Sequence, residues 1–432
     1  MRGERGLRTR LFCFLLITLL PLLAPSASAT TRVWTNVVGN AMWSNPTNWS
    51  NGVPVDGDSV VLLRHPLGSF VSAVNDLTNL TLASIRCESI GYNLGGGTLR
   101  LTGEVLMGGP LVGANMNISA PVEISGPTLN IVSTNSGSLT LSGVVNAPAG
   151  GVVIVEGGIT FRASQASDYR AATRLQSGFM ALLSTRIKGP LIVGGTTNFA
   201  TVVLQSGNVL GEFPPLTILT NGAVFNISTF NSVGPLTVNG GVLRLGNRSP
   251  NGEIAVNGNA LLTGGANLVV SAINSFGPGA LSVTGTVTLA GCTLTLQDAG
   301  ITQPSIIVHN DGNDAVIGTF TGRPEGSILT NATVRYVLSY VGGDGNDITL
   351  TPIIEPARFI SSTLTNGAPQ FLVQGQPGFT YVIEATTNLL SPPALISWTP
   401  IFTSGTRANG QFPFTDPDST NFSQRFYRVV KP

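Results

Sequence analysis

Short runs in which apolar and polar side chains alternate fill most of the chain between residues 97 and 299, as in Thr128–Ile131 and Ser138–Leu141. Alternation with a period of two puts the apolar side chains on one face of a strand and the polar ones on the other. Gly, Asn and Ser, which favour turns, separate the runs. The pattern predicts an all-β chain. The segment Ala166–Leu183 lacks the alternation, and a short helix or a loop is expected there.

A unit of strand, glycine and strand recurs within this region. The same spacing of residues around a glycine occurs in three sets: Val122, Ile124, Gly126, Leu129 and Ile131; Leu236, Val238, Gly240, Leu243 and Leu245; Ile254, Val256, Gly258, Leu261 and Thr263. A fourth copy, which begins at Leu281, shifts by one residue after Gly285. Glycine lets the backbone turn sharply without a side chain striking the neighbouring coil. Coils of this kind bury their apolar faces by stacking, so we expect a parallel β-helix (solenoid), with an antiparallel sandwich as the alternative.

The two ends of the repeat region differ from it in composition. A Trp-rich stretch, Trp34–Asp58, precedes the repeats and is expected to cap the first coil, because the open edges of a solenoid must be covered. Pro352–Pro356 predicts a stiff linker, since proline ends hydrogen-bonded ladders. Aromatic residues are frequent beyond it, which indicates a separate small fold. We therefore predict a Trp-rich cap with the first coils over residues 30–96, a β-helix repeat region over 97–352 and a small C-terminal β-sandwich-like module over 357–432.

The first 29 residues have the three parts of a secretory signal peptide. Four arginines precede the apolar run Leu11–Leu23, and Ala24–Ala29 supplies the small residues of a cleavage site. We place cleavage after Ala29, so that residues 1–29 form the signal peptide. The apolar run is shorter than the roughly 20 residues that span a bilayer, so no membrane span is expected after cleavage. The protein is expected to be exported, to the extracellular space, the cell surface or the periplasm.

The composition excludes some classes of partner. Charged residues make up 10% of the chain and the formal net charge is +1, so the chain lacks the basic surface that nucleic acids require. The hydrophobic fraction of 42% predicts a folded chain rather than a disordered one. Beyond the signal peptide the cysteines are Cys87 and Cys292. Two buried thiols are favoured for them, with one long-range disulfide as the alternative.

Three sets of motifs are shared with a known group of proteins. They are Val33-Trp-Thr with Trp43-Ser and Asn48-Trp-Ser; Ile317–Gly326 with Tyr340–Leu350; and Gly375–Leu389 with Gln424–Arg428. The first two resemble the opening and the recurring end of the repeat region in exported bacterial proteins with autotransporter-associated β-strand repeats. The third is similar to a C-terminal β-rich module often found with them. The resemblance implies a right-handed parallel β-helix and an extracytoplasmic location, but it carries no assigned chemistry.

The segment Gly342–Asp347 is the most suggestive short motif. It reads Gly-Gly-Asp-Gly-Asn-Asp and fits the first six positions of a calcium-binding nonapeptide, in which oxygens of residues such as Asp344 and Asp347 surround the cation. That nonapeptide needs a large apolar residue at its eighth position, where this chain has Thr349. A plain tight turn is therefore favoured. We expect no cofactor and no metal, with calcium at Asp344 and Asp347 as the alternative.

Two groups of side chains are candidates for contact with a ligand. The densest charged stretch of the repeat region supplies Arg162, Arg170, Arg174, Arg186 and Lys188, for which a solvated insertion is the alternative interpretation. Trp34, Trp43 and Trp49 can stack on sugar rings through apolar contact. Their spacing fits an aromatic plug over the first coil better than it fits a sugar-binding surface.

The sequence predicts a structural role rather than an enzymatic one. Hydrolase and lyase chemistry needs clustered carboxylates or cations, whereas the charges of the repeat region are scattered. The two histidines, His65 and His309, have no acid and nucleophile near them in sequence and are expected in exposed turns. We expect a secreted or cell-surface protein that is structural or adhesin-like and has no catalytic activity. Its expected partner is a polysaccharide or the cell-envelope surface. The sequence does not predict its oligomeric state. The alternatives are a carbohydrate-active β-helix enzyme, either a polysaccharide lyase or a hydrolase, and a non-catalytic carbohydrate-binding protein.

Overall fold

The computed structural model covers most of the chain beyond the predicted signal peptide, of which it describes only Ala29. The described residues are 29–35, 40–63, 71–108, 113–134, 136–162, 167–184, 186–228, 230–246, 252–271, 280–297, 301, 303–331, 334–389, 396–407 and 409–432. These residues form β-strands and short 3-10 helices, η1 (Pro46–Asn48) and η3 (Ser419–Asn421). The predicted all-β fold class is confirmed.

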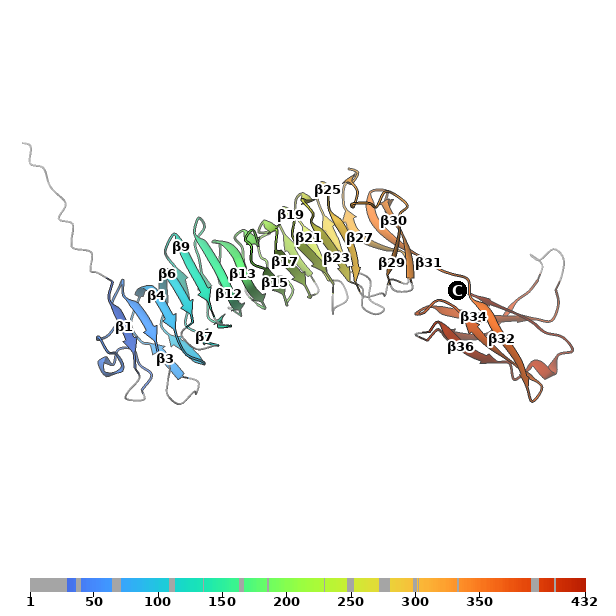
Figure 1. Ribbon diagram of the computed structural model, residues 1–432, viewed down its shortest axis with the longest axis horizontal. Helices are drawn as coiled ribbons and strands as arrows, with labels where there is room; N and C mark the ends of the chain where they lie inside the picture. Colours follow the sequence, from blue (N-terminus) through green and yellow to red (C-terminus); the bar gives the residue numbers. More distant parts are fainter. Residues whose placement is uncertain are drawn as a thin grey trace, which may run out of the picture.

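Most strands stack in register as parallel ladders along a gently curved axis (Figure 1). Most coils contribute a strand, or half of a long strand, to each of three ladders. Paired residues of successive coils lie between 18 positions apart, as for Thr173 and Leu191, and 29 positions apart, as for Thr288 and Ile317. The molecule is therefore the expected parallel β-solenoid, and the antiparallel sandwich is wrong for the repeat region.

The first ladder runs from the start of the described chain to the last coil. Its strands are β1 (Thr31–Trp34), β2 (Ser59–Leu62), the second half of β4 (Leu80–Cys87) and of β6 (Leu99–Met107), β9 (Thr128–Ser133), the first half of β12 (Val152–Phe161) and of β13 (Ala172–Leu182), β14 (Leu191–Val193), β16 (Leu216–Leu219), β19 (Leu236–Asn239), β22 (Ala260–Thr263), β25 (Val287–Ala290) and β28 (Ile317–Gly318).

The second ladder follows the first around one corner of each coil. Its strands are β3 (Val71–Asn75), β5 (Tyr92–Gly96), β7 (Asn115–Ile118), β10 (Ser138–Leu141), the second halves of β12 and β13, β15 (Ala200–Leu204), β17 (Gly222–Asn226), β20 (Val242–Leu245), β23 (Asn267–Ser271) and β26 (Thr293–Gln297).

The third ladder closes each coil and is the least regular. Its strands are the first halves of β4 and β6, β8 (Val122–Ile124), β11 (Val145–Asn146), β18 (Phe230–Val233), β21 (Glu253–Val256), β24 (Leu281–Val283) and β27 (Ser305–Asn310). Single bridges at Ala147, Tyr169, Ile187 and Leu210 continue it through the middle coils.

The core lies inside the coils and follows the alternation of the sequence. In β19, for example, Leu236 and Val238 are buried, whereas Thr237 between them points outward and is half-buried. Inward side chains of successive coils stack on one another, so a single continuous apolar core runs the length of the solenoid.

The predicted repeat copies are corners of the coil rather than whole coils. Leu236 pairs with Ala260, not with Ile254, because the unit at Leu236 joins the first and second ladders whereas the unit at Ile254 joins the third and first. One consequence is that Leu261, which the pattern placed inside, points outward and is 38% exposed. The copy that begins at Leu281, despite its shift by one residue after Gly285, is the true equivalent of the copy at Ile254.

Glycine occupies corners of the coil for the expected steric reason, because a side chain there would strike the neighbouring coil. A Cβ at Gly126 would lie 2.1 Å from the backbone oxygen of Thr102 in the neighbouring coil. The expectation of a short helix or a loop within Ala166–Leu183 is wrong for residues 172–182, which form β13, whereas the described residues 167–171 contain only a single bridge residue. This strand crosses a corner at Gly178, where φ is +88° and a Cβ would lie 2.4 Å from the oxygen of Gly157.

The two thiols and the two histidines can be placed in part. Cys87 and Cys292 are buried free thiols, so the disulfide alternative is wrong. His309 lies exposed on strand β27 opposite Ser282, rather than in a turn. His65 lies outside the described residues.

The N-terminal end of the solenoid is covered by the tryptophan-rich segment. Trp34, Trp43 and Trp49 are 1%, 0% and 5% exposed. Trp49 packs edge-on against both other rings, with centroid distances of 4.9 Å and 5.3 Å, and its Nε1 donates to the oxygen of Trp43 at 2.8 Å. The segment is fixed to the coils by a bridge from Met42 to Val74. The expected aromatic plug is present.

The C-terminal end of the solenoid is covered by antiparallel strands. They are β29 (Ile328–Asn331), β30 (Val334–Gly342) and β31 (Asp347–Ile353). Strand β31 pairs with β27, the last strand of the third ladder. The predicted linker Pro352–Pro356 is wrong in its first two residues, because Pro352 and Ile353 still pair with β30.

The chain ends in a separate module of two small antiparallel sheets (Figure 1). One sheet contains β32 (Arg358–Thr365), β33 (Ala368–Gln374) and β36 (Gln411–Thr415), and the other β34 (Thr380–Thr386), β35 (Thr399–Gly405) and β37 (Phe426–Val430). Aromatic contacts join the sheets, with ring centroids 4.9 Å apart for Phe371 and Tyr427 and 5.1 Å apart for Phe402 and Phe414. This arrangement fits the predicted β-sandwich-like module.

Candidate ligand-binding groove

The charged stretch between Arg162 and Lys188 does not form one surface. Arg174 projects from the first ladder, Arg162 follows the end of the second, and Arg170, Arg186 and Lys188 flank the third. A stretch of this length goes once around the coil, so its side chains leave on every face.

Two of these cations are neutralised by two acids, Asp168 and Glu212, which lie in different coils. Arg170 and Lys188 each contact both Asp168 and Glu212, with N···O distances of 2.8 to 2.9 Å. The hydrogen bonds from Lys188 and Arg170 hold the pKa of Asp168 below its usual value, and the pKa of Glu212 is lowered in the same way. The four charges, of which Lys188 is half-buried and the others are exposed, form a balanced network along the solenoid axis rather than a cationic site.

The tryptophan candidates are also engaged elsewhere. Because Trp34, Trp43 and Trp49 are buried in the plug, none of their rings presents an open face to a sugar. Of the calcium candidates, Asp344 is exposed in the turn between β30 and β31, whereas Asp347 is buried. Within the described ranges, no group of three or more His, Cys, Asp or Glu side chains is arranged to hold a metal ion.

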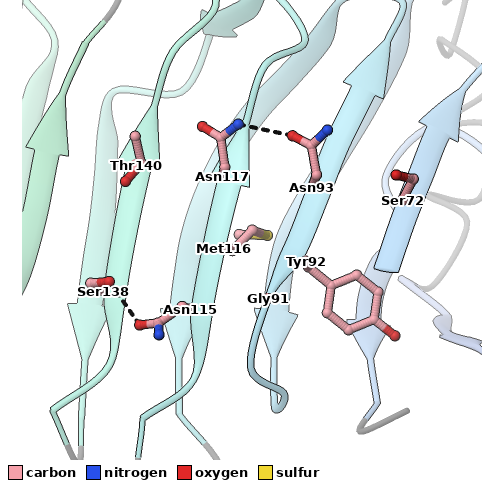
Figure 2. Close-up of a pocket in the computed structure, with 9 residues that line it drawn as sticks. All are labelled: Ser72, Gly91, Tyr92, Asn93, Asn115, Met116, Asn117, Ser138 and Thr140. Carbon is pink, nitrogen blue, oxygen red and sulfur yellow. Dashed lines mark hydrogen bonds between the residues drawn. The ribbon is translucent and has the colours of Figure 1, made fainter. Parts of the chain in front are cut away.

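A groove that the sequence did not single out lies on the outer face of the second ladder. It is an open hollow of about 590 Å³ between the coils of β3, β5, β7 and β10. Its lining residues are Ser72, Gly91, Tyr92, Asn93, Asn115, Met116, Asn117, Ser138 and Thr140. Figure 2 shows how they lie on four adjacent strands.

Two rows of polar side chains cross the strands in this groove. Ser72, Asn93, Asn117 and Thr140 occupy one register line of the ladder, and Asn115 and Ser138 occupy the next. Parallel register stacks equivalent positions about 4.8 Å apart, so the rows run along the solenoid axis. Each row offers regularly spaced polar groups to a ligand that lies across the strands.

Hydrogen bonds between the coils orient these side chains (Figure 2). The Nδ2 of Asn117 donates to the Oδ1 of Asn93 at 2.8 Å, and the hydroxyl of Ser138 donates to the Oδ1 of Asn115 at 2.8 Å. The Oδ1 of Asn117 in turn accepts from Ser142 at 2.8 Å. With their oxygens engaged, Asn93 and Asn115 have Nδ2 groups with no partner among the described residues, and these donors line the groove.

The groove contains one titratable side chain, Tyr92. Its ring is buried and its hydroxyl donates to the oxygen of Leu63 at 2.7 Å. Burial raises the pKa of Tyr92 above its ordinary value, so the phenol stays neutral at physiological pH. The lining is thus composed of neutral amides, hydroxyls and apolar atoms, which bind by hydrogen bonding and contact rather than by proton transfer.

The spacing of the row was present in the sequence as a weak signal. Ser72, Asn93, Asn117 and Thr140 recur every 21 to 24 residues at outward positions of short strands. The pattern is visible only once the coil length is known, because Ser, Thr and Asn also occur in every turn of the chain.

Comparisons with models of protein families, with curated proteins and with solved structures found no match. In the described part of the chain, no helix is long and apolar enough to cross a membrane.

Proposed function

We propose that the protein is an exported scaffold of adhesin type, secreted or held at the cell surface, whose solenoid binds a neutral polysaccharide chain along the groove without cleaving it. The observation that carries this proposal is the pair of amide and hydroxyl rows, in which hydrogen bonds between coils hold the asparagines and Ser138. Ligand binding is favoured when polar groups are already oriented, since less side-chain entropy is lost.

The chemistry of the lining favours a sugar polymer over other ligands. A neutral polysaccharide presents many hydroxyl groups, which both donate to and accept from amides and hydroxyls. Its monomers repeat at regular intervals, as do the side chains of the rows. Because the lining carries no charge, polyanions such as nucleic acids are poor ligands for this surface.

The test is retention of the purified protein on a panel of immobilised polysaccharides, with product release assayed in the same samples. We expect retention on at least one neutral polysaccharide and no formation of reducing ends or unsaturated products. Asn93→Ala combined with Asn117→Ala is expected to weaken binding at least about tenfold, which corresponds to loss of 1.4 kcal/mol.

Asn267→Ala is the matched control. Asn267 lies on the outer face of the same ladder, in β23, and accepts a hydrogen bond from Thr295 in the next coil, but it lies outside the groove. Equal losses for the double variant and the control would assign binding to another surface. Turnover of any substrate would instead favour a polysaccharide lyase or hydrolase.

A further inference from the structure

The two Asp-Gly-Asn-Asp segments of the chain, Asp311–Asp314 and Asp344–Asp347, lie side by side at the C-terminal end of the solenoid. Strands β27 and β31 are antiparallel neighbours, so the loop after β27 meets the turn before β31. The Nδ2 of Asn346 donates to the backbone oxygens of Gly312 at 2.5 Å and Asp314 at 3.0 Å. The Nδ2 of Asn310 donates to the same oxygen of Asp314 at 2.6 Å.

Both asparagines leave an oxygen without a partner. Asn310 is 0% and Asn346 7% exposed, and the Oδ1 of each is buried with no hydrogen-bond partner among the described residues. Exchanging the amide N and O atoms would not help, because the present nitrogens already face carbonyl oxygens. Since both amides converge on the Asp314 carbonyl, their unpartnered oxygens belong to one small knot of chain.

A buried carboxylate lies in the same knot. Asp347 is 1% exposed, and its Oδ1 accepts from the backbone N–H of Asn310 at 2.9 Å. Its other oxygen lies close to the turn, because a Cβ at Gly343 would be 1.8 Å from it. No cationic side chain of the described residues forms an ion pair with Asp347. A buried carboxylate is costly unless a cation or several donors compensate it.

We propose that this knot binds one calcium ion through the carboxylate of Asp347 and the amide oxygens of Asn310 and Asn346. Carboxylate, amide and backbone oxygens are the donors that calcium takes in proteins, and its flexible coordination accepts water at the remaining positions. The site differs from the nonapeptide arrangement, because Asp344 points to solvent and takes no part. With a single buried carboxylate, affinity is expected to be weak, on the order of 10⁻⁴–10⁻³ M as in extracellular modules.

The experiment is calorimetric titration of the purified, chelator-treated protein with CaCl2, together with thermal melting in the presence and absence of CaCl2. We expect binding in that range and a rise in Tm, with a smaller response to MgCl2, which needs stricter geometry. Asp347→Asn is expected to lower calcium affinity by at least about tenfold. Asp344→Asn, a matched change in the same turn, is expected to leave it unchanged.

Hydrogen exchange of the unaltered protein locates the site without relying on any variant. Calcium should slow exchange in the peptides that contain residues 310–314 and 342–347, and should leave the N-terminal cap unchanged. The proposal is wrong if calcium neither binds nor raises Tm, or if Asp347→Asn and the unaltered protein respond equally.

Discussion

Both ends of the solenoid must cover the open edges of a terminal coil, and they do so with different chemistry. At the N-terminal end the first ladder is covered by a plug of three buried indoles, which pack edge to face. At the C-terminal end the last coil continues into antiparallel strands, and amide groups lock the loop to the turn. The first end relies on apolar burial, and the second on backbone pairing with a polar knot.

The comparison shows what each kind of cap requires. A buried indole removes roughly 150–250 Å² from water, so three of them supply a large stabilisation. The Nε1 of Trp49 has a hydrogen-bond partner, whereas the buried Nε1 groups of Trp34 and Trp43 have none among the described residues. A polar knot stabilises only if each donor and acceptor is satisfied, since an unsatisfied buried group costs about 1–3 kcal/mol. At the N-terminal cap the apolar burial of three rings offsets two unpaired indole donors, whereas the C-terminal knot depends on completing its polar contacts.

Removal of one indole is expected to give the largest change in the free energy of unfolding. Trp43→Ala is expected to lower the free energy of unfolding by about 3–5 kcal/mol, as large-to-small changes in well-packed cores do. Denaturant unfolding measures the loss. Met42→Ala, at a largely exposed neighbour, serves as the control and should cost far less. A loss below about 1 kcal/mol for Trp43→Ala would show that the plug is not tightly packed.

The ion pair beside the plug gives a smaller effect that depends on pH. Arg32 contacts the buried Asp58 at 2.6 Å, and Asp58 also accepts from the backbone of Thr30 and Val55. Burial alone would raise the pKa of Asp58, but these hydrogen bonds together with Arg32 outweigh it, so the pKa lies below its ordinary value. Asp58 therefore contributes stability above its unfolded pKa of about 3.9, and this is lost as the pH falls through the folded pKa.

Arg32→Ala is expected to cost about 1–3 kcal/mol at neutral pH, because it leaves a buried carboxylate short of one charged donor. The difference from the unaltered protein should shrink on acidification below pH ~4, as Asp58 is protonated. Urea unfolding across pH measures both quantities. Arg86→Ala, which breaks the more exposed pair with Glu88, should cost about 1 kcal/mol or less. A pH-independent cost for Arg32→Ala would contradict the role of Asp58.

The sequence predicted the features that depend on periodicity and composition. Alternation identified the strands, and the cluster of tryptophans identified the N-terminal cap. The sequence did not predict the register of the ladders. The repeat pattern aligned Leu236 with Ile254, whereas the coil length pairs Leu236 with Ala260. Leu261 was therefore assigned to the inner face, although it points outward. The groove and the C-terminal knot are made by residues from separate coils or strands. Asn93 meets Asn117, and Asn310 meets Asp347, only after the register is fixed.

The labelling rates of the two buried thiols measure local opening at the two ends separately. These changes in rate are the smallest effects expected. Cys87 lies near the tryptophan plug and Cys292 near the antiparallel cap, and burial raises the pKa of each thiol to about 11. Reaction of either thiol with a disulfide reagent therefore requires local opening, since the thiolate is the reactive form. In a solenoid, coils contact mainly their neighbours, so opening at one end need not spread to the other.

Trp43→Ala is expected to speed labelling of Cys87 and leave the labelling rate of Cys292 unchanged. Asn346→Ala, which frees the loop after β27, is expected to do the reverse, with exposed Asn313→Ala as its control. Mass spectrometry of the labelled peptides measures both rates in one sample. If either variant speeds both thiols equally, the solenoid opens as one unit, and its two caps do not act independently.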